Sequence, residues 1–298
     1  MSVFFQVVLP VLLVFGAGYV IQKIAHLDIK SISTVALYVM LPNLVFKTFY
    51  EADLNEEYIM MVIFAALLLA AILIINKVTA TIKQFNQSLE SGMILSTAFM
   101  NSGNYGAPII LFAFGQEGFT YAVSFLVLQA IIMNFFGVYY AARGGAGIKL
   151  ALKTVMKMPP TYAVLLALVM NLGSFPVSEN LMSVITLVGD ATIPTVMLIL
   201  GMQLAEITVK QMEWGKVSYA SVVRLFVSPL IAYLLTLVLP MNSMLANVLI
   251  VAAACPSAAT TTMYAVQFDA KPDLVSSITL VTTLISVVTI PILLIVLG

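Results

Sequence analysis

The stretch that decides the fold runs Asn101-Ser-Gly-Asn-Tyr-Gly-Ala-Pro108. It is polar and helix-breaking, yet it lies within residues 91–114, which are otherwise apolar enough to cross a bilayer. A second interrupted segment, Cys255-Pro-Ser-Ala-Ala-Thr-Thr-Thr262, follows in the other half of the chain. In lipid an unpaired backbone group costs several kcal/mol, so such breaks persist only where protein buries them or a cavity lies beside them. Two breaks in corresponding places indicate the binding site of a secondary transporter.

Composition places the chain among integral membrane proteins. Hydrophobic residues make up 62% of it and charged residues 9%, whereas soluble proteins carry about 25% charged residues. A helical span needs roughly 20 apolar residues. We predict an all-α membrane protein of ten spans, drawn at residues 3–22, 32–50, 57–76, 91–114, 119–141, 159–174, 180–204, 217–239, 243–268 and 274–297. The longest connection, near residues 142–158, is too short for a nucleotide-binding module, which argues against an ATP-driven pump.

Charge placement predicts the orientation in the membrane. Eleven of the thirteen lysines and arginines follow odd-numbered spans, namely Lys23, Lys30, Lys77, Lys83, Arg143, Lys149, Lys153, Lys157, Lys210, Lys216 and Lys271. Lys47 lies at the opposite ends of the spans, where even-numbered spans finish, and Arg224 lies inside the eighth span. Because lysine and arginine accumulate in cytoplasmic loops, we expect both termini outside the cytoplasm of a cell (inner) membrane protein.

The two halves of the sequence repeat. Three proline pairs recur at nearly constant offsets of 150, 152 and 148 residues, namely Pro10 with Pro160, Pro42 with Pro194, and Pro108 with Pro256. Five spans per half is an odd number, so the second copy enters the membrane from the other side. We predict two inverted five-helix repeats, residues 1–145 and 146–298, in which the broken spans four and nine cross.

The crossing has the chemistry of an anion site. We expect half-helices to begin after Pro108 and Pro256 with their N-termini directed toward one another, where unpaired amides and the helix dipoles favour a negative group. Asparagine and threonine side chains add uncharged donors, and glycine lets the two backbones pass closely. The predicted substrate site comprises Asn101, Asn104, Gly106, Pro108, Pro256, Ser257, Thr260, Thr261 and Thr262.

These motifs resemble the auxin efflux carrier family, which includes the plant PIN-formed carriers and bacterial permeases. Residues 101–108 are similar to its fourth-span signature, in which an Asn stands seven residues before a Pro. Ala254-Cys-Pro-Ser-Ala-Ala-Thr-Thr-Thr-Met-Tyr-Ala265 resembles the ninth-span crossover, Leu41-Pro42-Asn43 the second span, and Ile193-Pro194 through Gly201-Met-Gln-Leu204 the seventh.

The resemblance implies a scaffold domain and a transport domain, elevator-like alternating access, and carboxylate substrates bound where spans four and nine cross. Asn101 would then be the ligand of the substrate carboxylate. The sequence departs from the plant carriers in two places: they have a second proline where Thr261 stands, and a long cytoplasmic loop in place of residues 142–158. These departures put auxin itself in doubt as the substrate.

Three further polar residues are candidates for coupling or for a structural role: Asp190, Arg224 and Asn43. An ionisable group at the depth of Asp190 is a functional hypothesis by default, such as a proton or cation site. The structural alternatives are that Asp190 caps a half-helix beginning near Pro194 or that it pairs with Arg224. For Arg224 we expect a side chain that reaches back to the membrane interface.

The sequence therefore predicts a secondary carrier of small organic anions, moved outward by the membrane potential. A proton- or sodium-coupled carboxylate symporter is the alternative. A channel or a transporter-like sensor is a competing class without supporting motifs. An intramembrane enzyme lacks a catalytic constellation, since the chain has one His and one Cys and no paired membrane carboxylates. We expect no cofactor, no metal and no nucleic-acid partner. The lipid bilayer surrounds the chain, and a homodimer is one candidate assembly.

Overall fold

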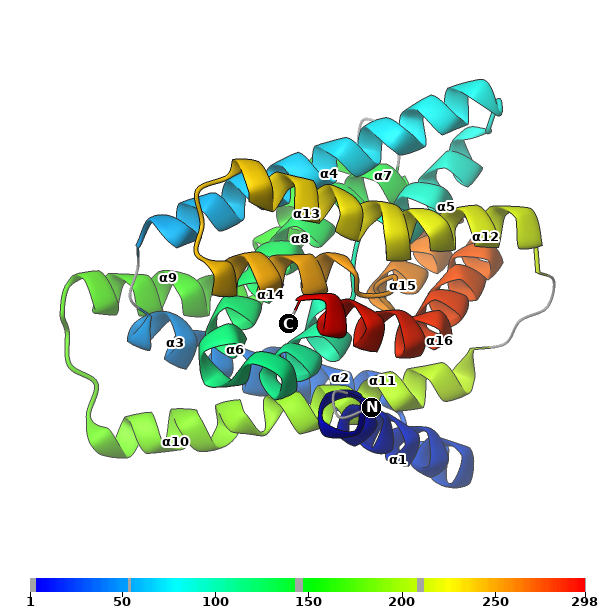
Figure 1. Cartoon of the computed structure of the whole chain (residues 1–298). Helices are drawn as coiled ribbons and strands as arrows, with labels where there is room; N and C mark the ends of the chain where they lie inside the picture. Colours follow the sequence, from blue (N-terminus) through cyan, green and yellow to red (C-terminus); the bar gives the residue numbers. More distant parts are fainter. Residues whose placement is uncertain (1–3, 53–54, 143–146, 208–211, 298) are drawn as a thin grey trace.

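The computed structural model describes residues 4–52, 55–142, 147–207 and 212–297 (Figure 1). Arg143 and Lys210, which count toward the predicted charge asymmetry, lie outside these residues. The described helices, with π-helical turns marked η, are η1 Phe4–Val8, α1 Leu9–Ala25, α2 Ile29–Val35, η2 Ala36–Met40, α3 Leu41–Glu51, α4 Glu56–Ile82, α5 Gln87–Ala98, η3 Ser102–Gly106, α6 Ala107–Ile132, η4 Met133–Gly137, α7 Val138–Ala142, α8 Gly147–Val155, α9 Pro159–Leu172, α10 Glu179–Asp190, α11 Thr192–Glu206, α12 Trp214–Val222, η5 Val223–Val227, α13 Ser228–Val238, α14 Ser243–Ala253, α15 Thr260–Gln267 and α16 Pro272–Leu297.

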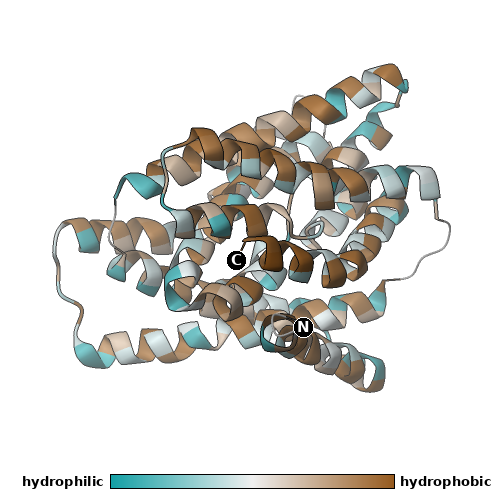
Figure 2. Cartoon of the chain, in the orientation of Figure 1, coloured by the Kyte–Doolittle hydropathy of each residue, from teal (hydrophilic) through white to brown (hydrophobic). Residues whose placement is uncertain are grey.

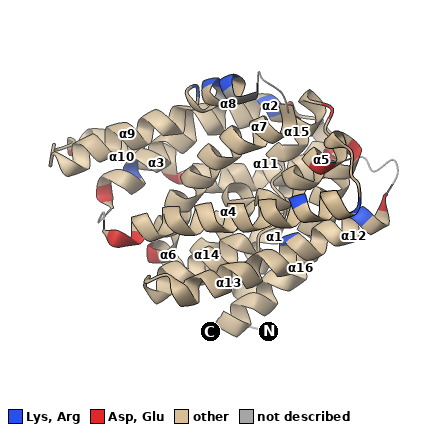
Figure 3. Cartoon of the chain, turned by 90° about the horizontal axis from the view of Figure 1, so that it is seen from above, with Lys and Arg blue, Asp and Glu red and all other residues tan. Residues whose placement is uncertain are grey.

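The surface of the helices is apolar, as a bilayer requires. Ile74, Leu172 and Val238 are exposed by 63%, 74% and 81%, and hydrophobic colour runs along most helices in Figure 2. Figure 3 shows long stretches of helix without a charged residue. Seven described helical stretches are long and apolar enough to cross a membrane. The chain is thus a multi-pass, all-α membrane protein.

The number of spans stays a prediction. One of the seven stretches, Ser102–Ala142, is 41 residues long, about twice the roughly 20 residues that a bilayer needs. Within it α6 leaves helical geometry at Gly115, where φ is 66° and ψ is −159°. The predicted boundary between spans four and five, residues 114–119, coincides with this glycine.

Prolines shape the helices by widening the turn before them. Four of the five described π-helical turns, η1, η2, η3 and η5, end two residues before a proline. Proline has no N–H, and its ring clashes with the carbonyl four residues earlier. A π turn relieves this conflict without ending the helix. Pro10, Pro42, Pro108 and Pro229 therefore lie within continuous helical stretches.

The helices pack in two groups. In one, α1 packs on α11, and α3 on α9 and α10; in the other, α4 packs on α5 and α13, α13 on α14, and α15 on α16. In Figure 1 α1, α10 and α11 lie along the bottom of the view, and α4, α12 and α13 along its top. The helix α6 contacts both groups through α3 and α14.

Candidate substrate-binding site

Two short extended segments cross at the centre of the second group. The helix α5 ends at Ala98 and α14 ends at Ala253, and the chain after each of them is not helical. The Asn101 N–H donates to the Pro256 carbonyl at 2.8 Å, and the Ala258 N–H donates to the Phe99 carbonyl at 3.0 Å. Met100 and Ser257 form an isolated antiparallel bridge. The broken segments of the sequence therefore pair with one another, which satisfies part of the backbone that each break frees.

The positions of the breaks differ from the sequence prediction. We expected half-helices to begin after Pro108 and Pro256, but helix resumes at Ser102 in the first break and at Thr260 in the second. The Gly106 N–H donates to the Asn101 carbonyl at 2.9 Å, so the polar run is a π turn rather than a loop. Pro108 lies inside the first turn of α6, whereas Pro256 lies in the crossing segment itself. The two prolines are not structurally equivalent, because a π turn accommodates the first of them.

Asn101 holds an unused donor at the crossing. Its residue is 6% exposed, and its side-chain nitrogen Nδ2 is buried without a hydrogen-bond partner. A buried unsatisfied amide costs about 1–3 kcal/mol, so it requires an explanation. A bound acceptor would satisfy it.

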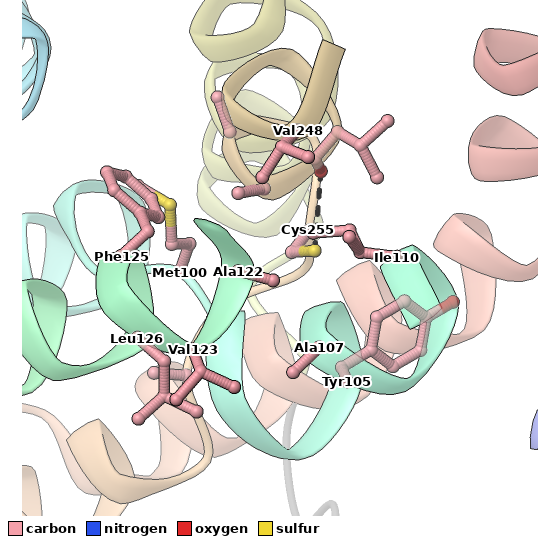
Figure 4. Close-up of a cluster of buried hydrophobic side chains, with 14 of the residues drawn as sticks. Met100, Tyr105, Ala107, Ile110, Ala122, Val123, Phe125, Leu126, Val248 and Cys255 are labelled. Carbon is pink, nitrogen blue, oxygen red and sulfur yellow. Dashed lines mark hydrogen bonds between the residues drawn. The ribbon is translucent and has the colours of Figure 1, made fainter. Parts of the chain in front are cut away.

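The close packing of the Cys255 side chain at the crossing depends on Gly106. A Cβ atom built on Gly106 would lie 2.9 Å from the Cys255 Sγ atom. Cys255 is fully buried, and its thiol lies among apolar side chains that include Ile110 and Ala122 (Figure 4). It packs as a small apolar residue, as its place in the sequence predicts.

The other predicted residues divide into two sets. Asn104 and Thr260 are half-buried near the helix starts, where they remain able to line a site. The Thr261 and Thr262 hydroxyls donate to the carbonyls of residues 258 and 259, both at 2.7 Å. Their hydroxyls are thus engaged within the first turn of α15.

Ser257 faces α16, which the sequence analysis did not assign to the site. The Ser257 N–H donates to Thr282 Oγ1 at 3.2 Å, and Thr279 Oγ1 donates to Ser257 Oγ at 3.4 Å. Farther along α16, Ser286 Oγ donates to the Tyr105 hydroxyl at 2.8 Å. Hydroxyl residues spaced three or four apart share one helix face, and that spacing in residues 279–286 was the available signal.

Arg224 does not reach the membrane interface, so that prediction was wrong. Its side chain is completely buried. The guanidinium donates to the Thr97 carbonyl at 2.8 Å, to Ser228 Oγ at 2.5 Å, and to the Ala253 carbonyl. These carbonyls lie at the ends of α5 and α14, so one side chain bonds both half-helices where they stop. The sequence placed Arg224 near a helix end but could not show which way it points.

Asp190 and Asn43 lie in the other helix group. Asp190 forms an ion pair with Lys47 at 3.4 Å, not with Arg224. It also does not cap α11, whose N-cap residue is Ala191 and has no side-chain cap. Both structural alternatives for Asp190 were therefore wrong. Asn43 Nδ2 donates to the Val39 carbonyl one turn back, at 2.7 Å.

Comparison with known proteins identifies the family of the chain. Residues 3–151 and 145–294 match a family model described as membrane transport protein. The chain belongs to this family. It is the auxin efflux carrier family that the sequence motifs resemble. The chain is 27% identical over 294 residues to an uncharacterized transporter of Methanothermobacter thermautotrophicus, and 27% identical over 300 residues to one of Methanocaldococcus jannaschii. In both cases the match covers 96% of each chain.

Members of the auxin efflux carrier family are membrane transporters, and both relatives carry the name transporter. Neither name specifies a substrate. The substrate class therefore has to be argued from the crossing.

Proposed function

We propose that this carrier is a secondary transporter of small organic anions, carboxylates above all, which it moves outward by elevator-type alternating access driven by the membrane potential. The observation that carries the proposal is the crossing of two interrupted helices beside the buried, unpartnered Asn101 amide nitrogen. The cargo would bind at this crossing.

The crossing favours a negative ligand because two helices begin there. The first turn after Asn101 leaves backbone N–H groups without intrahelical acceptors. In the turn after Ala259 the Thr261 and Thr262 N–H groups donate to the carbonyls of residues 258 and 259, and at both helix starts the dipole adds partial positive charge. The Asn101 amide adds an uncharged donor. Behind the crossing, Arg224 carries a full positive charge, and among the residues that the structure describes no carboxylate forms an ion pair with it. A carboxylate is the ligand that uses the Asn101 amide and the positive helix starts, while Arg224 donates to the Thr97 and Ala253 carbonyls and acts on it only through its charge.

The packing supports ten spans in two inverted repeats, residues 1–145 and 146–298. Spans one and seven pack as α1 on α11, and their counterparts six and two pack as α9 on α3. Spans three and four pack as α4 on α5, and eight and nine as α13 on α14. The group containing α1, α3, α9, α10 and α11 would be the scaffold, and the group holding the crossing would move. The proposal also includes a homodimer that forms through the scaffold. It places the protein in the cell membrane with both termini outside the cytoplasm.

The membrane potential can drive this transport because the cargo is an anion. An interior-negative potential expels one negative charge with about 2.3 kcal/mol per 100 mV, roughly a fifty-fold gradient. Outward movement of an anion therefore needs no coupling ion. Since Asp190 is not a cap, a proton- or sodium-coupled carboxylate symporter remains the second candidate.

The test is efflux from proteoliposomes. Melting of the purified protein is first screened against acetate, malonate, succinate and indole-3-acetate, because a ligand of the folded state raises the melting temperature. Efflux of the best radiolabelled ligand is then followed under an imposed potassium diffusion potential without a proton or sodium gradient. We expect the potential to accelerate efflux. Efflux that ignores the potential but follows an imposed proton or sodium gradient would replace uniport by symport.

Asn101→Ala tests the site in the same assay. We expect efflux to fall roughly tenfold or more, the loss for one hydrogen bond to a charged group. The ligand-free melting temperature should stay near that of the wild type, because Nδ2 has no partner to lose and the crossing bonds of Asn101 are made by its backbone. Asn43→Ala is the matched control and should transport normally. Normal efflux by Asn101→Ala would reject the crossing as the substrate site.

A further inference from the structure

A cavity of about 690 Å³ lies between α3, α6 and α11. This volume is within the range of roughly 300–1,000 Å³ found for small-molecule sites. None of the crossing residues lines it. Its polar lining residues are Lys47, Thr48, Glu51, Gln116, Thr120 and Asp190.

The cavity lies on the boundary between the two helix groups. Leu111 and Phe112 line it from α6, the same helical stretch that starts at the crossing. Leu111 is ten residues beyond Asn101, which corresponds to about 15 Å along a helix. The cavity is therefore separate from the crossing and lies farther along the same helical stretch. A solute that reached the crossing along this boundary would pass through it.

Lys47 is the one cation among the cavity's lining residues, and the carboxylate of Asp190 already pairs with it. Its side chain is 23% exposed, and Nζ lies 3.4 Å from Asp190 Oδ1. The pair is brought together by a close helix contact: a Cβ atom on Gly189 would lie 3.0 Å from the Leu44 backbone nitrogen. Asp190 thus offers Lys47 a carboxylate, the same chemical group that a carboxylate substrate would offer.

The internal carboxylate is held weakly. A strong ion pair of this type measures about 2.7–2.9 Å, and the Asp190 side chain is 63% exposed. Asp190 is also the last residue of α10, where the helix dipole disfavours a negative charge. A free carboxylate that contacted Lys47 directly would face little competition from this partner.

We propose that Lys47 is a second anion site, at which the carboxylate of a small organic anion replaces that of Asp190 on its way to or from the crossing. The proposal rests on the proposed function, because it takes an organic anion as the cargo. With Glu51 also facing the cavity, two carboxylates and one ammonium line it. An anion therefore binds to Lys47 only by displacing the carboxylate of Asp190. Lys47 attracts the cargo, and Asp190 competes with it.

Opposite effects of two substitutions distinguish this role from a structural ion pair. Lys47→Gln and Asp190→Asn break the same pair and should change the ligand-free melting temperature alike. Lys47→Gln should raise the half-saturating carboxylate concentration roughly tenfold, the loss for one hydrogen bond to a charged group. Asp190→Asn should lower it several-fold, since it removes the competitor. Lys47→Arg, which keeps the charge, should stay close to the wild type.

The measurement is the thermal stabilisation of purified protein by acetate, malonate, succinate and indole-3-acetate, with malonamide as the uncharged control. Each variant is made in the native sequence and in Asn101→Ala, where binding at the crossing is weakened and the cavity site remains. We expect weaker, saturable carboxylate binding in Asn101→Ala, which Lys47→Gln removes and Asp190→Asn strengthens.

The outcomes separate the two proposals. If Lys47→Gln and Asp190→Asn shift carboxylate affinity in the same direction, or not at all, the second site is rejected whatever Asn101→Ala does. If they act oppositely while Asn101→Ala binds like the wild type, the cavity site stands and the crossing site fails. If no carboxylate of the panel stabilises the wild type or any variant, both proposals fail.

Discussion

At the scale of the residue, Arg224 is the side chain on which the crossing most depends. Two helix C-termini carry partial negative charge, and the guanidinium bonds a carbonyl at each of them. Asn76, which stands 148 positions earlier in the sequence, donates to Thr97 Oγ1 at 2.8 Å. The two predicted repeats would thus place a polar side chain at matching positions behind the crossing. The arginine balances the charge of the broken helices from behind.

Arg224→Met should destabilise the carrier severely. It leaves the Thr97 carbonyl without its donor and the Ala253 carbonyl with only the Ser228 hydroxyl, which donates to it at 3.0 Å, and a buried unsatisfied group costs about 1–3 kcal/mol. Arg224→Lys should be milder, because it keeps the charge but loses the planar fork that spans two acceptors. Lys216→Gln is the control in the same span: its partner Glu213 is exposed, so about 1 kcal/mol or less is at stake. The measurement is the melting temperature of each variant in detergent. Equal melting temperatures for Arg224→Met and Lys216→Gln would contradict a stabilising role of Arg224 at the two helix ends.

At the scale of the element, none of the half-helices crosses a bilayer alone. The helices α5, α14 and α15 have 12, 11 and 8 residues, fewer than the roughly 20 that a span requires. They persist because the extended segments pair and the second helix group encloses them. The contact between α1 and α11 is different, since there two helices touch backbone to backbone. A Cβ atom on Gly18 would overlap the Leu198 carbonyl, and one on Gly201 the Phe15 carbonyl.

Gly201→Ala should therefore push α1 and α11 apart. Overpacking costs about 1–3 kcal/mol, and small residues are what allow membrane helices to approach closely. Gly16→Ala is the matched control on α1, because a Cβ atom there meets nothing within 4 Å. We expect a lowered melting temperature for the first variant and an unchanged one for the second. Equal melting temperatures of both variants would contradict the close backbone contact between α1 and α11.

At the scale of the whole molecule, orientation determines which compartment each end of the cavity and the crossing faces. The charge asymmetry predicts that the connection at residues 114–119 is outside and that the connection after α4 is cytoplasmic. Gly115 has a left-handed φ of 66°, so a cysteine there would be strained. Glu117 and Lys83 are exposed and better suited as probe positions.

Glu117→Cys and Lys83→Cys in a Cys255→Ala background test the orientation. An impermeant thiol reagent added to intact cells should label the first and miss the second. The wild type should stay unlabelled, because Cys255 is fully buried. The reverse pattern would place both termini in the cytoplasm and contradict the predicted orientation.

The class of protein and the two helix interruptions could be predicted from the sequence because both depend on local properties. Hydrophobic runs define membrane helices wherever they occur, and polar, helix-breaking residues at 101–108 and 255–262 mark interruptions without reference to the rest of the chain. The family followed from the same residues.

What the sequence by itself determined, then, was an all-α membrane transporter with two broken segments, one in each half of the chain. Only the tertiary structure decided that residues 99–101 pair with residues 256–258, that Arg224 turns inward to two helix ends, and that Asp190 meets Lys47. The physical reason is that each of these contacts joins residues far apart in the chain. The direction of a side chain on an apolar helix, and the helix it meets, depend on packing between elements, which no local pattern records.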